Sequence, residues 1–183
     1  MPDILIVYAS RDGHTRSIAQ RLQRQLDEQG VQVRLVDVGS AADLDPSAFQ
    51  VVAVGGSVVY GKHDPRLSRF LIENAHRMTD CRRVFFSVNL IARKPEKQTI
   101  EGNVYVRKFL DNLPLNLDHV EILAGKLDYP SYGFLDRIMI QLTMKFTDGP
   151  TDRKTVIDYT DYEQVDRFAD LLKTLASDGV TAS

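Results

Sequence analysis

A strand, a short polar loop and a helix follow one another at the start of the chain, and this succession constrains the fold more than any other feature. Residues 4–9 are an apolar run of strand length, and the next loop carries a hydroxyl at each end, Ser10 and Thr15, with Gly13 inside. Apolar residues then recur at helical spacing up to a helix stop at Gly30, at Ile18, Ala19, Leu22 and Leu26. The pattern predicts an α/β protein.

In α/β proteins the backbone N–H groups of such a loop converge with the positive end of the helix on one anion. The loop lacks both G-x-x-x-x-G-K-[ST] and G-x-G-x-x-G, so neither a Walker-type site nor a dinucleotide site is indicated. It is either a phosphate site or an ordinary turn whose hydroxyls cap the helix. The candidate cofactor contacts are Ser10, Arg11, Asp12, Gly13, His14 and Thr15.

Apolar runs alternate with helical patterns along the whole chain, which predicts βαβ units and a parallel sheet. Asp64 and Pro65 form a helix start, and the string 160–163 reads as a capping box opened by Thr160. We expect strands at 3–9, 31–38, 49–55, 83–89 and 119–125, and helices at 15–29, 65–77, 102–112 and 162–176.

Five strands with an anion loop after the first predict the flavodoxin-like doubly wound order, with helices on both faces of the sheet. We expect one domain over residues 1–177, with an insert at about 126–160 before the last helix, and a loose C-terminal tail over 178–183. The insert is too long for a plain connection between a strand and a helix.

The insert contains a helical pattern over residues 134–146 that is apolar on two sides. One stripe consists of Leu135, Ile138, Met139, Leu142 and Phe146, and Ile140 and Met144 lie roughly opposite. Such a helix is either buried on both sides or presents one side to a membrane, a partner or an apolar substrate. Because Arg137 and Lys145 flank them, Ile140 and Met144 are predicted to contact the membrane or a quinone.

Two further loops should share the ligand end of the sheet with the first loop. One contains Ser57, Val58, Val59, Tyr60 and Gly61, and the other contains Ser87, Val88, Asn89 and Leu90. A phosphate site, a glycine–aromatic loop and a polar loop on one rim fit a phosphorylated planar cofactor, of which FMN is the obvious candidate. Tyr60 alone is equally an ordinary rim aromatic. No catalytic triad or carboxylate pair is indicated, so the cofactor would carry the chemistry.

Composition and charge limit the remaining possibilities. A net charge of −2 argues against a nucleic-acid binder that acts through bulk charge. Cys81 is the single cysteine and the four histidines are scattered, so no metal site is expected. The absence of a signal peptide and of a 20-residue apolar run predicts a cytoplasmic protein. The sequence is compatible with an oligomer.

Several strings resemble the menaquinone-dependent protoporphyrinogen IX oxidases, which are flavodoxin-like proteins of haem synthesis. They are S-R-D-G-H-T at 10–15, S-V-N-L at 87–90, A-R-K-P-E-K at 92–97, Y-x-R-K-F-L at 105–110, D-R-x-M-I at 136–140, M-K at 144–145 and Y-T-D-Y-E-Q-V at 159–165. The chain departs from the expected pattern at His14, where Gln is expected, and at Tyr162, where Trp is expected.

The resemblance implies FMN as cofactor, protoporphyrinogen IX as substrate and a menaquinone-type quinone as electron acceptor. It also implies peripheral association with the inner face of the cytoplasmic membrane. The basic loop that contains Arg93, Lys94 and Lys97 would then attract the propionate carboxylates of the substrate, unless it is simply a solvated loop.

Other classes of protein use the same fold. A flavodoxin-type electron carrier docks its partners through an acidic rim, which the basic loop at 93–97 argues against. A flavodoxin-like quinone reductase and a regulatory module without a working flavin remain as alternatives.

Overall fold

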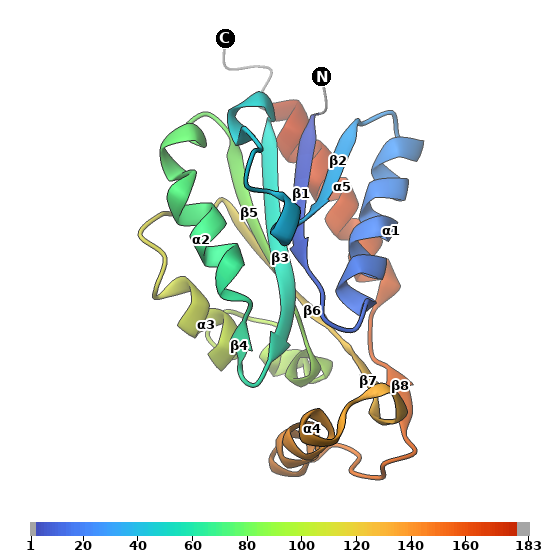
Figure 1. The fold of residues 1–183 in the computed structure, drawn as a ribbon. Helices are drawn as coiled ribbons and strands as arrows, with labels where there is room; N and C mark the ends of the chain where they lie inside the picture. Colours follow the sequence, from blue (N-terminus) through green and yellow to red (C-terminus); the bar gives the residue numbers. More distant parts are fainter. Residues whose placement is uncertain (1–2, 179–183) are drawn as a thin grey trace.

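A five-stranded parallel sheet in the order β2-β1-β3-β5-β6 runs through the molecule (Figure 1). The structure is a computed structural model that describes residues 3–178. The strands are β1 (Ile4–Ala9), β2 (Val33–Asp37), β3 (Val51–Val59), β5 (Arg82–Asn89) and β6 (His119–Ala124), and the short β4 (Lys62–His63) pairs antiparallel with the end of β3. The predicted strands and the flavodoxin-like order are confirmed. Of the tail predicted at 178–183, only Asp178 belongs to the described residues, and it ends the last helix.

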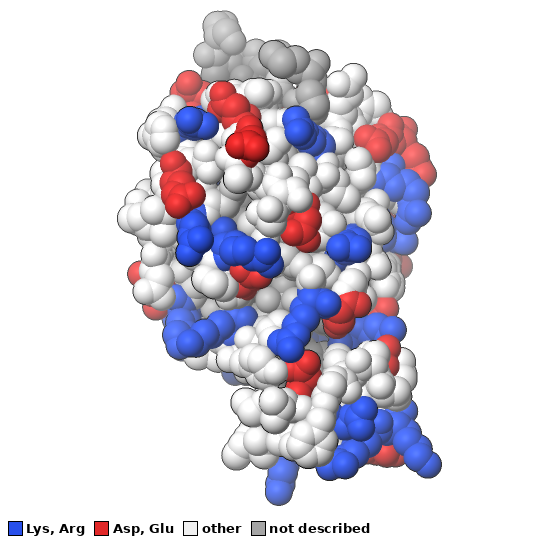
Figure 2. All heavy atoms as spheres, viewed as in Figure 1, with Lys and Arg blue, Asp and Glu red and all other residues white. Residues whose placement is uncertain are grey.

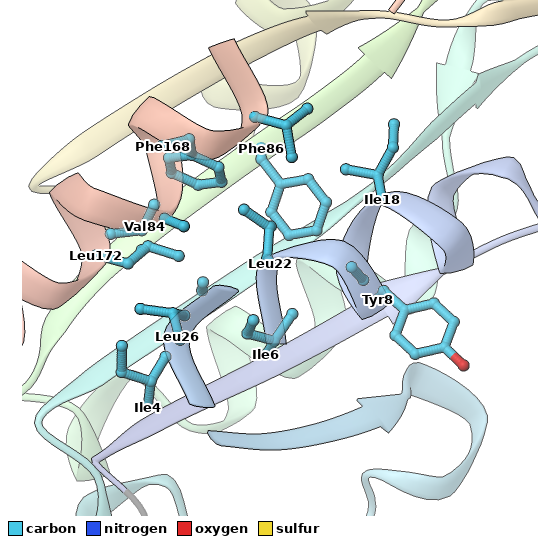
Figure 3. Close-up of a cluster of buried hydrophobic side chains, with 14 of the residues drawn as sticks. Ile4, Ile6, Tyr8, Ile18, Leu22, Leu26, Val84, Phe86, Phe168 and Leu172 are labelled. Carbon is cyan, nitrogen blue, oxygen red and sulfur yellow. The ribbon is translucent and has the colours of Figure 1, made fainter. Parts of the chain in front are cut away.

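Helices cover both faces of this sheet, as predicted (Figure 1). The faces are covered by α1 (His14–Glu28) and α5 (Tyr162–Asp178) on one side, and by α2 (Pro65–Glu73) and α3 (Val104–Leu110) on the other. Side chains of β1 alternate between the two layers. Ile4 and Ile6 pack with Leu22 and Phe168 (Figure 3), whereas Leu5 packs in the cluster of the opposite face.

Several elements are shorter than the sequence-based expectation, among them α2, which ends at Glu73, and α3, which spans Val104–Leu110. Two further differences concern β3 and the cap of the last helix. β3 continues through Gly55 and Gly56 to Val59 instead of ending at residue 55. Glycine is needed at position 55 because a Cβ there would collide with the Phe86 ring of the neighbouring strand. The last helix is capped by Asp161, whose Oδ1 accepts hydrogen bonds from the N–H groups of Glu163 and Gln164. The prediction that Thr160 opens a capping box is therefore wrong, and the Thr160 hydroxyl instead donates to the carbonyl of Ala124.

The insert forms a small unit beyond the carboxyl ends of the sheet strands (Figure 1). β7 (Lys126–Asp128) and β8 (Val156–Asp158) pair antiparallel, and α4 (Phe134–Phe146) lies between them in sequence. The helix predicted over 134–146 is confirmed.

The orientation of α4 is the reverse of the one predicted. Met144 is fully buried against Leu127 and Tyr129, and Ile140 is half-buried beside the same cluster. By contrast, the stripe that contains Leu135 and Phe146 faces outward. The prediction that Met144 contacts a membrane or quinone is therefore wrong, and Ile140 does not face outward either.

Candidate functional site

A cleft of about 470 Å³ opens at the carboxyl ends of the central strands. Its walls are formed by the loop after β1, the end of β3, the loop after β5, the start of β7 and the inner side of α4. This is the position at which open α/β sheets bind ligands, and the volume suits a cofactor-sized molecule. The residues predicted to contact the cofactor line it, with the exception of Ser10, Gly13 and Ser87.

The residues that do not reach the cleft shape its loops. Ser10 Oγ accepts hydrogen bonds from the N–H groups of Gly13, at 3.1 Å, and Arg16, at 3.3 Å. Gly13 has a φ of +89° and its missing Cβ would meet nothing within 4 Å, so the position requires glycine for its backbone conformation. Ser10 and Gly13 thus hold the loop in a shape that turns directly into α1.

Thr15 is the strongest candidate for a contact with an anion. It lies in the first turn of α1 and is fully buried, and its hydroxyl has no hydrogen-bond partner among residues 3–178. A buried hydroxyl without a partner is unfavourable, so an acceptor on a ligand would satisfy it. Together with the N-terminal end of α1, this hydroxyl fits a phosphate group.

His14 points away from the sheet toward the segment that returns from the insert. Its Nε2 lies 2.8 Å from Thr160 Oγ1 and 3.8 Å from Asp158 Oδ1. Burial lowers the pKa of His14 below its ordinary value, although Asp158 and Asp12 partly oppose this shift. At neutral pH the uncharged ring therefore links the loop after β1 to the junction of β8 and α5.

Contacts in the wall of the cleft converge on one carboxylate, Asp136 of α4. Arg11 Nη2 donates to Asp136 Oδ2 at 2.9 Å, and the hydroxyl of Tyr60 donates to Asp136 Oδ1. The Arg11 guanidinium also lies over the Tyr60 ring, 5.1 Å from its centroid. Asp136 belongs to a string that supported the family resemblance, but nothing in its local sequence predicted that it would face the loop after β1.

A buried polar chain supports the loop after β5. His63 Nε2 lies 2.7 Å from Ser87 Oγ, which accepts from Asn89 Nδ2 at 2.9 Å. Asn89 Oδ1 in turn accepts from the N–H of Ala92 and from Asn103 Nδ2. Burial lowers the pKa of His63 to about 4, so its ring is neutral at physiological pH. Sequence analysis missed His63 and Asn103, because these residues meet only in the folded sheet.

Two tyrosines that were not predicted also line the cleft. Burial raises the pKa of Tyr105, and it raises the pKa of Tyr132 to about 12. The Tyr132 hydroxyl donates to the carbonyl of Lys126 and accepts from the N–H of Asp128, which fixes the start of the insert. Both phenols therefore remain protonated and present aromatic surface to the cleft.

The basic loop does not reach the cleft, in contrast to the prediction. Arg93 is half-buried, and its guanidinium donates to the carbonyl of Leu90 and to both the carbonyl and the hydroxyl of Thr147. Lys94 pairs with Asp148 at 3.3 Å, and Lys97 is not part of the cleft wall. For Arg93 and Lys94 the predicted contact with the substrate is therefore replaced by a structural role, in which they anchor the end of α4. For Lys97 the contact stays a prediction, at a position outside the cleft wall.

Comparison with known proteins gives matches over almost the whole chain. A model of the flavodoxin domain matches residues 5–154. Protoporphyrinogen IX dehydrogenase (quinone) of Escherichia coli strain K12 is 41% identical over 165 residues, which cover 90% of this chain and 91% of that protein. The Leishmania major protein of the same name is 38% identical over 169 residues, which cover 92% of this chain and 73% of that protein.

Solved structures of low sequence identity share the fold. A short-chain flavodoxin associated with a bacterial microcompartment superposes with a TM-score of 0.56 at 14% identity, over 96% of this chain and 99% of that chain. This likeness supports the flavodoxin-like architecture alone.

Proposed function

Because the chain belongs to the flavodoxin domain family and to the family of the protoporphyrinogen IX dehydrogenases (quinone), we propose that it oxidises protoporphyrinogen IX to protoporphyrin IX, with FMN as cofactor. A quinone of the menaquinone type accepts the electrons, and the reaction belongs to haem biosynthesis. One structural observation carries the proposal, namely the cleft in which the phosphate loop, two strand-end loops and α4 meet.

The residues of the cleft fit FMN. The first turn of α1, with the unpartnered hydroxyl of Thr15, would hold the phosphate. The loops at 57–61 and 88–90 would hold the ring, and Tyr60 offers a half-exposed aromatic face beside it. FMN, when bound, supplies the redox chemistry by accepting electrons from the substrate and passing them to the quinone.

The protein itself positions and shields the reacting molecules. The buried chain from His63 through Ser87 to Asn89 fixes the loop after β5, so its backbone groups are preorganised. On the opposite wall, Met139 and Ile140 of α4 offer apolar surface to a macrocycle or a quinone and exclude water from the cleft.

Flavin content and turnover test this proposal. The purified protein should show flavin absorption at about 450 nm, and should oxidise protoporphyrinogen IX anaerobically only when a quinone is added. The product is followed by its fluorescence. A protein that binds FMN but shows no quinone-dependent turnover would be an electron carrier of the flavodoxin type, and the proposal would be abandoned.

We also propose that the outer side of α4 binds the inner face of the cytoplasmic membrane. The exposed apolar residues of this side are Phe134, Leu135, Leu142 and Phe146. The insert also carries exposed cations, at Lys145 of α4 and at Arg153 and Lys154 of the segment that follows it. Figure 2 shows this end of the molecule as a largely uncharged surface beside a group of Lys and Arg side chains. Apolar side chains next to cations suit a surface of anionic lipids.

Within residues 3–178, no helix combines the length and hydropathy needed to cross a membrane.

Vesicle co-sedimentation tests the membrane proposal. Burying two large apolar side chains contributes about 3–6 kcal/mol when both are fully desolvated. A Leu142→Ser, Phe146→Ser double variant should therefore lose most binding to phosphatidylglycerol vesicles. Ile72→Ser on α2, where the side chain is 43% exposed, is the matched control and should bind as the parent protein does. If the double variant and the control bind equally well, α4 is not the contact surface.

A further inference from the structure

Arg11 lines the cleft, and most N–H groups of its guanidinium make no hydrogen bond within the described residues. Within the described residues its guanidinium makes one hydrogen bond, to Asp136, and half of its side-chain surface is exposed. A guanidinium offers five N–H groups in a planar fork that matches a carboxylate at two points. The single contact with Asp136 therefore leaves most of this fork free.

Asp136 is placed so that it can give up this contact at little cost. It lies in the first turn of α4, where the positive end of the helix stabilises a carboxylate. The hydroxyl of Tyr60 is a second partner and remains available when Arg11 moves away. An ion pair this exposed contributes little to stability.

The surroundings of Arg11 fit an amphipathic anion. Aromatic and apolar groups line the cleft beside it, among them Tyr60, Tyr105 and Met139. By contrast, two of the cations predicted to bind substrate carboxylates are occupied elsewhere, since Arg93 holds Thr147 and Lys94 holds Asp148, and Lys97 is not part of the cleft wall. Among residues 3–178, the cleft wall contains one arginine, Arg11, and its other lysine or arginine, Lys126, pairs with Asp128 at 3.1 Å.

We propose that Arg11 recognises a carboxylate of the substrate, and that Asp136 occupies the guanidinium as an internal carboxylate until the substrate replaces it. The inference rests on the proposed function, in which the substrate is a tetrapyrrole with two propionate groups. No covalent bond is formed or broken in this exchange. A carboxylate of the substrate takes the place of the Asp136 carboxylate on the guanidinium of Arg11. Asp136 then competes with the substrate for Arg11, and keeps its hydrogen bond from the Tyr60 hydroxyl when the substrate enters.

Equilibrium binding of two porphyrins to the FMN-loaded protein tests the exchange. One is protoporphyrin IX and the other is its dimethyl ester, which has the same macrocycle without the carboxylates. Arg11→Gln should weaken binding of the diacid about tenfold, as expected for the loss of a charge-assisted hydrogen bond, and should leave the ester unchanged. FMN affinity of each variant is measured first, so that the titrations are done with the cofactor saturating.

The Asp136→Asn variant should change the affinity for the diacid in the opposite direction. Removal of the competing carboxylate should tighten binding of the diacid several-fold, whereas a pair that merely fastens α4 would give weaker binding. Arg66→Gln is the matched control, because Arg66 is 52% exposed against 50% for Arg11 and also pairs with an aspartate, Asp64. This control should bind both porphyrins as the parent protein does.

The following results would contradict the proposed exchange between Asp136 and the substrate. Equal weakening of diacid and ester by Arg11→Gln, or weaker diacid binding by Asp136→Asn, would overturn the exchange. Unchanged diacid binding by Arg11→Gln in a protein that still oxidises porphyrinogen would overturn it too, and would leave the proposed function standing. A parent protein that neither binds nor oxidises the tetrapyrrole would overturn both.

Discussion

Thr15→Val should stabilise the apoprotein and weaken FMN binding at the same time. The Thr15 hydroxyl is buried without a partner among residues 3–178, which costs about 1–3 kcal/mol relative to a satisfied group. Valine has the same shape and lacks the hydroxyl, so the apoprotein should gain about 1 kcal/mol or more in its free energy of unfolding.

The affinity change follows from the same hydroxyl. A hydrogen bond to a charged acceptor is worth about 1.5–3 kcal/mol, so its loss to the FMN phosphate should raise the dissociation constant about 10- to 100-fold. Riboflavin lacks the phosphate, and its affinity should be the same for Thr15→Val and the parent protein. Thr15→Ser keeps the hydroxyl and should retain most of the FMN affinity.

Urea unfolding of the apoprotein and quenching of flavin fluorescence measure the two quantities. The combination of higher apoprotein stability with lower FMN affinity distinguishes a hydroxyl reserved for the ligand from a residue that only packs. If Thr15→Val lowers the stability of the apoprotein, or leaves FMN affinity unchanged, the hydroxyl has no role in holding the phosphate.

Three further changes test the packing around the cleft. Burial lowers the pKa of His63 from 6.5 to about 4, so the unfolded chain is protonated at a higher pH than the folded protein. The free energy of unfolding should therefore fall by roughly 3 kcal/mol as the pH drops from 6.5 to 4. His63→Gln should flatten that part of the urea-unfolding profile, and an unchanged profile would contradict the assignment. Met144→Ala should lower stability by about 2–5 kcal/mol, because the side chain is fully buried, and a smaller loss would mean that the insert folds around the gap. Gly55→Ala should cost at least about 2 kcal/mol through its collision with Phe86, and Gly61→Ala, which has room at 3.5 Å from Tyr105 and strains only its positive φ, should cost less.

The sheet was predictable from local patterns because both of its faces are covered. The run Ile4–Ala9 is apolar at every position, and every one of its residues is buried, as expected for a central parallel strand between two helical layers. The helix start at Asp64 and Pro65 was equally local, since the carboxylate accepts from a backbone N–H two residues on. Such features depend on neighbours in the sequence, so no tertiary information is needed.

The features that the sequence did not predict depend on contacts between residues that are distant in the sequence. The strand predicted to end at residue 55 continues through Gly55 and Gly56, which are glycines because Phe86 and Leu67 approach the strand closely. The buried chain around Ser87 joins residues from β4, β5 and the start of α3. No spacing in the sequence indicates that His63 and Asn103 meet, so this support of the cleft could be found only in the fold.

The prediction of the orientation of α4 was wrong for a different reason. Both sides of the helix are apolar, so periodicity alone could not decide which side is buried. The side with Met144 is buried because Met144 packs against Leu127 and Tyr129. The stripe with more apolar residues is left outside, which is the opposite of the usual rule for a surface helix.

The two ends of α4 are held by different kinds of contact, and this difference is consistent with the proposed exchange in the wall of the cleft. The C-terminal end is fixed by the half-buried guanidinium of Arg93 on Thr147 and by the buried side chain of Met144. The N-terminal end is held at Asp136 by an ion pair with Arg11 that water reaches and by a hydrogen bond from the Tyr60 hydroxyl. Since exposed ion pairs are weak and buried contacts are not, we expect any opening of the insert to begin at the end that faces the loop after β1. Arg93 and Lys94 of the basic loop would then keep the C-terminal end of α4 in place.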